Sequence, residues 1–496
     1  MNEHSGCGLV IFGASGDLCN RKLLPALLEL SGDNKLSDDF KIFGVGRTER
    51  SDEAWRQEAA AALQGMNYPP EVLERFLSRL HYRVLQYDSV ADFDRLYEEL
   101  NQVMHCPCRQ DNSSGGEVHG RVLFHLAVPP LVAYRIVESL GASEFGRSER
   151  LRKHCAVLVE KPFGMDLASA KEMNQLLTGN FAEDSIYRID HYLAKDTVRN
   201  IVVFRFANAI FEPLWNRNYI ESVSIEANEV LGVEARGAYY DKSGVVRDMI
   251  QNHVLQLLAL IAMEPPAGSD VEAIREKKHE VFKLLRPLTD DDWCLGQYDS
   301  YRHSPGVASD STTPTFAAMR VMVDNWRWYG VPFYLRSGKG LREKKTEITI
   351  LFRSIPLCVL GDEQSCARVQ KNVLKIRIQP QEGISFYFNV QSPGLSGQGI
   401  ELSNLQFNYS QLGAVSGESY SRVVLDAMNG RPALFWRSDT VEEAWQFVES
   451  MLDSDRVAKQ GKLYGYAMGS DGPAAAKKFQ MPDETMKYIG KAGENA

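Results

Sequence analysis

The sequence predicts two domains of different fold class: an α/β domain with a doubly wound parallel sheet, then a larger β+α domain with a mainly antiparallel sheet. Three observations predict this. Apolar strand-like runs alternate with helical patterns in the first third of the chain, which is the order that builds a parallel sheet. A glycine-bearing turn joins the first of these runs to the first helical pattern. Later strand-like runs follow one another without a helix between each pair, which favours antiparallel pairing.

In the first domain, short apolar runs end at Gly or Pro. The predicted strands cover residues 8–13, 40–45, 122–127 and 156–159. A helix is predicted over 21–30, because its leucines recur at helical spacing. The polar stretch 108–120 predicts an exposed loop.

The second domain is predicted from alternating apolar and polar residues. Strands are expected at 222–225, 316–323, 347–352, 373–378 and 384–390, with helices gathered on one face of their sheet. Residues 301–315 read as a second exposed loop. We place the boundary near Asp190, which gives domains of residues 1–190 and 191–496.

Composition excludes several classes of protein. The 56 basic and 65 acidic residues give a net charge of −9, which disfavours a nucleic-acid partner but allows local basic pockets. No apolar run reaches the length of a membrane span, and the first eight residues lack the features of a signal peptide. The eight cysteines are scattered, so we expect free thiols in a cytoplasmic protein and no metal site.

The turn after the first strand is a candidate phosphate-binding loop. It reads Gly13-Ala14-Ser15-Gly16-Asp17-Leu18. Glycines allow close backbone approach, and the following helix offers N–H donors to a phosphate. The pattern is shorter than the full dinucleotide motif and by itself also fits a tight turn, but its place between strand and helix favours a cofactor.

The end of the second predicted strand distinguishes NADP from NAD. Arg47 follows this strand, where NAD-dependent enzymes commonly carry an acidic residue. A guanidinium can bind the 2′-phosphate of NADP with two hydrogen bonds. Arg47 alone also fits a surface residue, but together with the glycine turn it predicts NADP.

Motifs spread along the chain resemble the glucose-6-phosphate dehydrogenase family. Beyond the glycine turn, the matching segments are Arg21-Lys22-Leu23-Leu24-Pro25, Glu160-Lys161-Pro162-Phe163-Gly164, Arg188-Ile189-Asp190-His191-Tyr192-Leu193, Arg205-Phe206-Ala207-Asn208, Arg247-Asp248-Met249-Ile250-Gln251-Asn252-His253, Asp324-Asn325-Trp326-Arg327-Trp328 and Arg336-Ser337-Gly338-Lys339. The resemblance implies an NADP-binding Rossmann domain and oxidation of glucose 6-phosphate at C1 to 6-phospho-D-glucono-1,5-lactone, the first step of the oxidative pentose phosphate pathway. It also implies a homodimer or homotetramer formed through the second domain's sheet.

The predicted chemistry needs a base for the C1 hydroxyl proton. His253 lies on the apolar stripe of a helical pattern, where a core histidine is the simpler interpretation, but polar neighbours surround it in sequence. The resemblance implies that His253 is the general base and that Asp190 stabilises its imidazolium.

The resemblance also implies the substrate and cofactor contacts. The substrate residues are Lys161, His191, Tyr192, Lys195, Glu229, Asp248, Lys339 and Lys344, with Gln379 a weaker match. His191, Tyr192 and Lys195 are expected to bind the substrate phosphate. Asp88 and Ser89 are expected at the adenosine end of the cofactor, and Lys161 beside the nicotinamide.

Two other functions remain open on the sequence. A related oxidoreductase acting on a non-phosphorylated aldose would share the Glu160-Lys161-Pro162 segment but would not need the phosphate residues. A catalytically inactive NADP-binding sensor would be expected to lack His253 or Asp190, and both are present. Some members of the family use NAD beside NADP.

Overall fold

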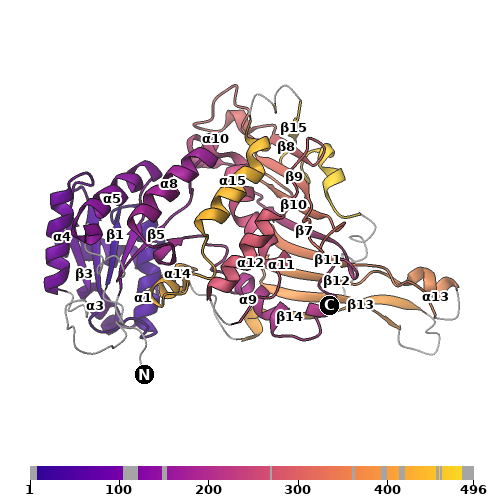
Figure 1. The fold of residues 1–496 in the computed structure, drawn as a ribbon, viewed down its shortest axis with the longest axis horizontal. Coiled ribbons are helices and arrows are strands. Elements are labelled where there is room, and N and C mark those ends of the chain that lie inside the picture. Colours follow the sequence, from indigo (N-terminus) through magenta and orange to yellow (C-terminus); the bar gives the residue numbers. More distant parts are fainter. Residues whose placement is uncertain are drawn as a thin grey trace. The chain divides into compact units, whose positions relative to one another are not determined.

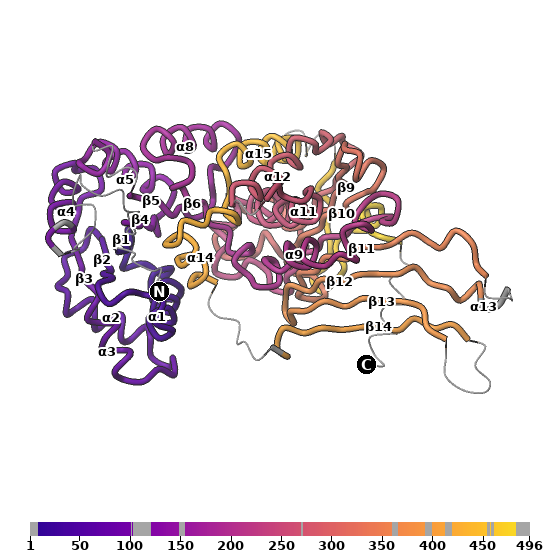
Figure 2. The backbone as a smooth tube through the Cα atoms, turned by 60° about the horizontal axis from the view of Figure 1, so that its bottom comes forward, coloured from indigo at the N-terminus to yellow at the C-terminus, as the bar shows by residue number. Residues whose placement is uncertain are grey.

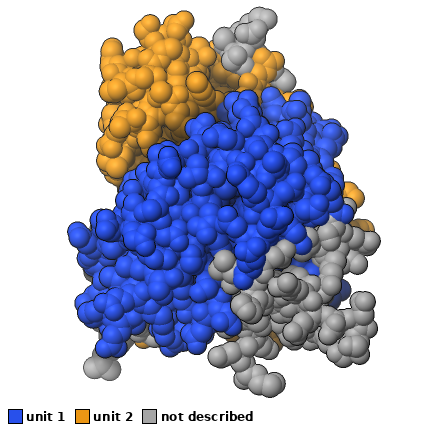
Figure 3. Space-filling model, turned by 90° about the vertical axis from the view of Figure 1, so that its left-hand side faces the viewer, with its two compact units in different colours: residues 1–194, 266–276, 416–442 blue, residues 195–265, 277–415, 443–496 orange. Residues whose placement is uncertain are grey.

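The computed structural model describes residues 8–103, 121–147, 154–268, 271–359, 363–391, 399–412, 419–453, 457 and 461–482. The chain forms two compact units, shown in two colours in Figure 3. Unit 1 comprises residues 1–194, 266–276 and 416–442, and unit 2 comprises residues 195–265, 277–415 and 443–496. Two short segments from late in the sequence therefore belong to the first unit.

Unit 1 is built on a six-stranded sheet with the strand order β3-β2-β1-β4-β5-β6. The strands are β1 (Gly8–Phe12), β2 (Lys41–Gly46), β3 (Leu80–Val84), β4 (Val122–Leu126), β5 (Cys155–Val159) and β6 (Ile186–Arg188). All neighbouring pairs are parallel. The strand order reverses between β1 and β4, and doubly wound sheets bind ligands at the carboxyl ends of strands at such a point.

Helices cover both faces of this sheet (Figure 1), so its inner strands β1 and β5 are buried at every position. On one face, side chains of β1 and β2 share a core with α1 (Leu24–Gly32), α2 (Asp52–Ala62), α3 (Pro70–Ser78) and α14 (Ser419–Met428). On the other face, Phe12 stacks on Phe93 of α4 (Val90–Val103), with ring centroids 5.7 Å apart. The remaining helices of the unit's first segment are α5 (Pro130–Ala142), α6 (Glu144–Arg147), α8 (Leu167–Asn180) and the 3-10 turn η3 (Glu183–Ser185).

A buried ion network joins the three segments of unit 1. Glu183 accepts two hydrogen bonds from Arg188, at 2.8 and 3.2 Å, and one from Arg275, at 2.9 Å. Both arginines are only 1% exposed. The same carboxylate accepts the backbone N–H of Ser438 at 3.0 Å. Glu183 therefore compensates two buried cations that come from different parts of the chain.

Unit 2 is built on a nine-stranded sheet with the order β14-β13-β12-β11-β7-β10-β9-β8-β15. The strands are β7 (Ile220–Asn228), β8 (Trp293–Tyr298), β9 (Phe316–Val321), β10 (Phe333–Gly338), β11 (Lys345–Phe352), β12 (Val373–Gln379), β13 (Gly383–Gln391), β14 (Ile400–Asn408) and β15 (Leu463–Tyr466). Its pairs are antiparallel except β7 with β10 and β8 with β15. Strands β11 to β14 run side by side as long ribbons toward α13 (Glu363–Arg368) (Figure 2).

The two faces of the second sheet differ in chemistry. One face is apolar and packs against helices: Val223 and Ile225 of β7 and Leu335 of β10 are fully buried. The helices of this unit include α9 (Asp196–Phe206), α10 (Gly237–Val245), the π-helix η6 (Val246–Val254) and α11 (Leu255–Ala262). Two further helices, α12 (Val271–Lys283) and α15 (Ser438–Leu452), begin in residues assigned to unit 1 and end in residues assigned to unit 2. The prediction of a mainly antiparallel sheet is confirmed.

The opposite face of this sheet carries ion pairs. Lys345 lies 3.2 Å from Glu226, and Lys375 lies 3.2 Å from Glu347. Burial alone would lower the pKa of Lys345, but the charges of Glu226 and its other carboxylate neighbours raise that pKa above its usual range. Lys345 thus has a structural role in the sheet through these ion pairs.

Two sequence predictions need correction. The regular helix predicted over 21–30 begins with a π-helical turn, η1 (Cys19–Leu23), in which the Leu24 N–H donates to the Cys19 carbonyl. Pro25 follows and has no N–H, so the ordinary hydrogen bond to Arg21 cannot form there. The eight cysteines are not all free thiols, because Cys358 forms a disulfide with Cys366 of α13, eight residues further on. Cys19 and Cys294 are buried thiols, and Cys7, Cys106 and Cys108 lie outside the described residues.

Every strand predicted from the sequence is present, with bounds shifted by a few residues. Strands β3, β6, β8, β10, β14 and β15 were not predicted. Residues 301–315 form a loop apart from the 3-10 turn η7 (Tyr301–His303), and the predicted loop at 108–120 lies outside the described residues. Among the described helices, none has the length and apolar character needed to span a membrane.

Candidate functional site

The glycine turn after β1 leaves its backbone open to a ligand. Gly13 has φ +86°, and a Cβ there would lie 2.4 Å from the Ala127 carbonyl oxygen at the end of β4. The Gly13 N–H donates to the Val45 carbonyl at 2.9 Å, which ties the turn to the end of β2. Only glycine satisfies both the positive φ and the close contact. Ala14 is buried, Ser15 and Asp17 are exposed, and Gly16 and Leu18 are half-buried, so the turn presents backbone rather than bulky side chains.

Arg47 stands beside this turn in unit 1. It directly follows β2, is exposed, and forms no ion pair with any carboxylate in the described part of the chain. Arg50, three residues further on, is already engaged by Glu58 at 3.2 Å. Arg47 therefore keeps its guanidinium available to an anion at the end of β2. The fit of this turn and of Arg47 to a phosphorylated dinucleotide supports NADP as the cofactor.

Asp88 and Ser89 lie after β3, at the outer side of the same sheet. Asp88 is exposed, and the Ser89 hydroxyl accepts the backbone N–H of Asp92 at 3.3 Å as α4 begins. Ser89 thus has a structural role at the helix start. The role of Asp88 and Ser89 at the adenosine end of the cofactor stays a prediction.

Lys161 extends from the carboxyl end of β5, two strands from the turn. It is half-buried and is joined to Pro162 by a cis peptide bond. Its neighbour Glu160 is held on both carboxylate oxygens, by His125 of β4 at 2.9 Å and by the Tyr420 hydroxyl of α14 at 3.1 Å. The sequence predicts a matching segment that contains Glu160, but no role for Glu160, His125 or Tyr420. For His125, the sequence did offer one signal: a polar histidine stands inside the apolar run of β4.

Asp190 follows β6, the last strand of the sheet. It is 4% exposed, and its Oδ1 accepts the Tyr192 N–H at 2.9 Å. His191 is half-buried and packs edge-on against the Tyr192 ring, with centroids 5.2 Å apart. A short turn thus fixes Asp190, His191 and Tyr192 relative to one another.

His253 belongs to unit 2 and lies on the π-helix η6. Gly244, with φ +63°, kinks the chain before this helix, and the Val245 N–H donates to the Pro314 carbonyl at 2.9 Å. The His253 side chain is fully buried. The backbone N–H of His253 donates to the Asn252 side-chain oxygen at 2.6 Å. π-helical turns often occur at functional sites because they displace side chains from regular helical spacing. Asp248, on the same helix, is half-buried.

Two of the predicted substrate residues contact each other in unit 2. The Lys339 ammonium forms an ion pair with the Glu229 carboxylate. It also lies 5.1 Å from the centroid of the buried Tyr240 ring. Burial first, and then the charges of Asp248 and other groups, hold the pKa of Tyr240 well above its usual value, so this phenol stays protonated.

The remaining predicted residues of unit 2 are spread more widely. Lys195 donates to the Gln379 side-chain oxygen at 2.8 Å, which brings the weaker match Gln379 beside a predicted phosphate ligand. Lys344 is exposed. The structure therefore joins Lys195 with Gln379 and Lys339 with Glu229.

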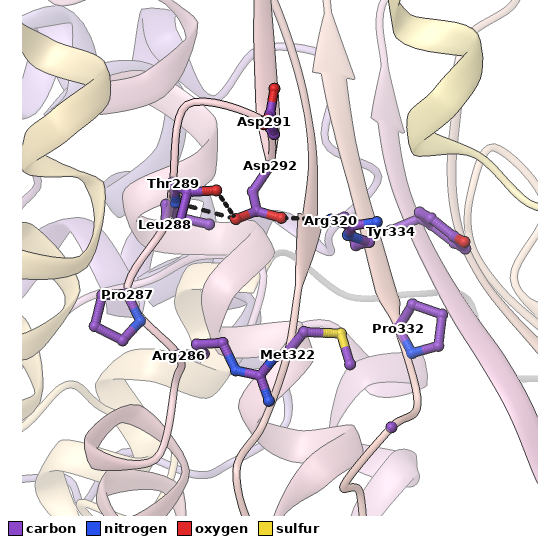
Figure 4. Close-up of a pocket in the computed structure, with 11 residues that line it drawn as sticks. Arg286, Pro287, Leu288, Thr289, Asp291, Asp292, Arg320, Met322, Pro332 and Tyr334 are labelled. Atoms are coloured by element: carbon purple, nitrogen blue, oxygen red, sulfur yellow. Dashed lines mark hydrogen bonds and ion pairs between the residues drawn. The ribbon is translucent and has the colours of Figure 1, made fainter.

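A separate pocket of about 570 Å³ lies in unit 2 and is drawn in Figure 4. Arg320 donates to Asp292 at 2.8 Å, and Asp292 also accepts the Thr289 hydroxyl at 2.6 Å. None of the predicted site residues lines this pocket. Arg286, also in the lining, pairs with Asp324 at 2.6 Å.

A doubly wound parallel sheet, an open glycine turn at its switch point and an available arginine after the second strand define a dinucleotide-binding oxidoreductase of the α/β class. Comparison with known proteins narrows this class. Residues 10–200 match the model of the glucose-6-phosphate dehydrogenase NAD-binding domain, and residues 202–488 match that of the glucose-6-phosphate dehydrogenase C-terminal domain. The chain belongs to the glucose-6-phosphate dehydrogenase family.

Individual relatives cover almost the whole chain. It is 42% identical to a glucose-6-phosphate 1-dehydrogenase of Aggregatibacter actinomycetemcomitans, over 95% of each chain. It is 38% identical to a cytoplasmic glucose-6-phosphate 1-dehydrogenase of Arabidopsis thaliana, over 96% of this chain and 91% of the relative. A solved glucose-6-phosphate dehydrogenase in complex with its substrate glucose 6-phosphate shares the fold with a TM-score of 0.85 and 32% identity, over 99% of this chain and 98% of that one. The predicted family is confirmed.

Proposed function

We propose that this chain oxidises D-glucose 6-phosphate at C1 to 6-phospho-D-glucono-1,5-lactone, with NADP⁺ as the hydride acceptor, in the first step of the oxidative pentose phosphate pathway. The main support is that nearly the whole chain matches the models of both domains of one enzyme family. The open turn at Gly13 and the available Arg47 supply the cofactor side of this reaction.

His253 acts as the general base in this proposal. The reaction removes a proton from the C1 hydroxyl and a hydride from C1 as the C1–O bond becomes a carbonyl. An imidazole nitrogen of His253 takes the proton, which suits a group whose ordinary pKa is near neutrality. NADP⁺, when bound, accepts the hydride. Asp190 stabilises the imidazolium that forms; this assignment rests on the sequence resemblance and on the fixed, buried position of the carboxylate.

The substrate contacts are divided between phosphate and sugar. His191, Tyr192 and Lys195 bind the phosphate, and Lys161, Glu229, Asp248, Lys339 and Lys344 bind sugar oxygens or orient the substrate. In the structure Glu229 and Lys339 pair with each other. In this proposal the sugar hydroxyls take over part of that pairing, because a carboxylate and an ammonium offer them an acceptor and a donor.

The cofactor and substrate residues belong largely to different domains. The NADP-binding domain of residues 1–190 carries Gly13 to Leu18, Arg47, Asp88, Ser89 and Lys161, and the domain of residues 191–496 carries the base and most substrate residues. The second domain's sheet is proposed to form a homodimer or homotetramer. We place the enzyme in the cytoplasm, as the name of the Arabidopsis relative indicates for that protein.

Initial rates on two substrates test this function. We expect NADPH formation at 340 nm with glucose 6-phosphate to exceed that with unphosphorylated glucose by at least about 100-fold in kcat/KM, the scale on which a site built for a charged group discriminates against its absence. Equal rates on both sugars would instead favour the aldose oxidoreductase. No NADPH formation with either sugar would favour the inactive sensor.

Replacing Arg47 tests the cofactor assignment. Arg47→Ala should raise the KM for NADP⁺ by about 10- to 100-fold, the scale of one or two charge-assisted hydrogen bonds to phosphate. The KM for NAD⁺, which has no 2′-phosphate, should change less than about twofold. Arg50→Ala is the matched control, because Arg50 already pairs with Glu58. An unchanged KM for NADP⁺ in Arg47→Ala would show that another group binds the 2′-phosphate.

A further inference from the structure

The Glu160 carboxylate lies at the centre of a buried network in unit 1. His125, on β4, is fully buried, and its Nε2 lies 2.9 Å from Glu160 Oε1. The Tyr420 hydroxyl, on α14, donates to Glu160 Oε2 at 3.1 Å. The imidazole and phenol rings also stack, with centroids 6.3 Å apart and planes inclined by 23°. Each oxygen of the carboxylate thus has its own hydrogen-bond donor, and the two donor side chains contact each other through their rings.

The protonation states of this network follow from its hydrogen bonds. A carboxylate accepts hydrogen bonds only, so His125 must carry its proton on Nε2. Its Nδ1 is buried and has no hydrogen-bond partner in the described part of the chain. Burial first, and then Glu160 and Asp190, raise the pKa of Tyr420 far above its usual value, which keeps the phenol a donor.

The network acts at the backbone that carries Lys161. Glu160 directly follows β5, and Lys161 is the next residue, ahead of Pro162. A side chain held at both oxygens fixes the rotation of the chain where it leaves the strand. Tyr420 comes from a segment 260 residues away, and its helix packs into the core shared by β1 and α1. The carboxylate is therefore anchored to two elements that do not depend on the loop itself.

We propose that His125 and Tyr420 are positioning residues, which hold Glu160 so that Lys161 is presented to the substrate in one orientation. The inference rests on the proposed function, in which Lys161 contacts the substrate. Neither His125 nor Tyr420 needs to touch a ligand in this role. Small losses of orientation are costly in catalysis, because reacting groups must be held within a fraction of an ångström.

A double-mutant cycle on kcat/KM for glucose 6-phosphate tests the proposal. Tyr420→Phe removes one hydrogen bond and preserves the ring, and it should lower kcat/KM about tenfold, the scale of a hydrogen bond to a charged group. In a Lys161→Ala background, the same change should have less than about a twofold effect, because the group it positions is absent. Equal losses in both backgrounds would show a general structural effect and overturn the proposal.

A second pair of variants keeps the test decisive if Tyr420→Phe does not fold. His125→Gln retains an amide donor near the Nε2 position, and it should keep kcat/KM within about threefold, whereas His125→Leu should lose about tenfold. Tyr134→Phe is the matched control: it removes a hydroxyl that donates to the Ser169 carbonyl at 3.0 Å in the same unit, and it should change kcat/KM less than twofold. Wild-type levels in both Tyr420→Phe and His125→Leu would overturn the inference, whereas an inactive wild-type enzyme would contradict the proposed function instead.

Discussion

Asparagine in place of His253 should lower kcat for glucose 6-phosphate oxidation by roughly 10²–10⁴-fold, the usual scale of general-base catalysis. Asparagine has a similar polar shape but no nitrogen that can take a proton near neutral pH. The side chain is fully buried on η6, so a substitution close to its volume is needed to preserve packing. Substrate binding should be largely retained, since the lost interaction belongs to the transition state.

Single-turnover rates and the dissociation constant of glucose 6-phosphate should be measured together for this variant. His303→Asn is a suitable control, because His303 is an exposed histidine of the same unit. A loss of kcat with an unchanged dissociation constant identifies a group that acts only in the chemical step. Turnover near the wild-type rate in His253→Asn would mean that another residue takes the C1 proton.

The elements that could be predicted from the sequence are those with a strong local pattern. The runs of β1 and β5 are buried on both faces and therefore apolar at every position. The glycine turn was recognisable because the positive φ of Gly13 and its close contact with Ala127 leave no other choice of residue. Strand β14 was missed because its side chains are mostly half-buried or exposed, so it has no apolar periodicity to detect.

The sequence predicts candidate residues for the site, but it does not indicate which of them meet in the fold. Lys339 and Glu229 are 110 residues apart in sequence, and no spacing indicates that they pair. The positions of Tyr420 and Glu183 likewise depend on which distant segments pack into unit 1. The π-helix around His253 was interpreted as a regular helical pattern, because one widened turn changes the apolar spacing very little. Local patterns thus identify elements, whereas long-range packing decides which polar groups meet.

The second large effect is expected on stability, from Glu183→Gln. This change removes the negative charge between Arg188 and Arg275 but keeps the size of the side chain. Both guanidiniums are 1% exposed. Arg188 would therefore remain buried without this counter-charge, and Arg275 would keep only its pair with Glu272 at 3.0 Å. Breaking a buried ion pair by removing one partner typically costs about 3–5 kcal/mol, and we expect the free energy of unfolding to fall by that amount.

The free energy of unfolding in urea should be measured for Glu183→Gln and, as a control, for Glu144→Gln. The comparison distinguishes the buried network from an ordinary surface ion pair. Glu144 pairs with Arg147 at 3.0 Å on the surface of the same unit, with both side chains about half exposed, and its loss should cost less than about 1 kcal/mol. A similarly small cost for Glu183→Gln would mean that solvent reaches the two arginines once the carboxylate is lost. A large cost would instead show that one carboxylate holds together segments that lie far apart in the chain, including the strand β6 that leads into Asp190.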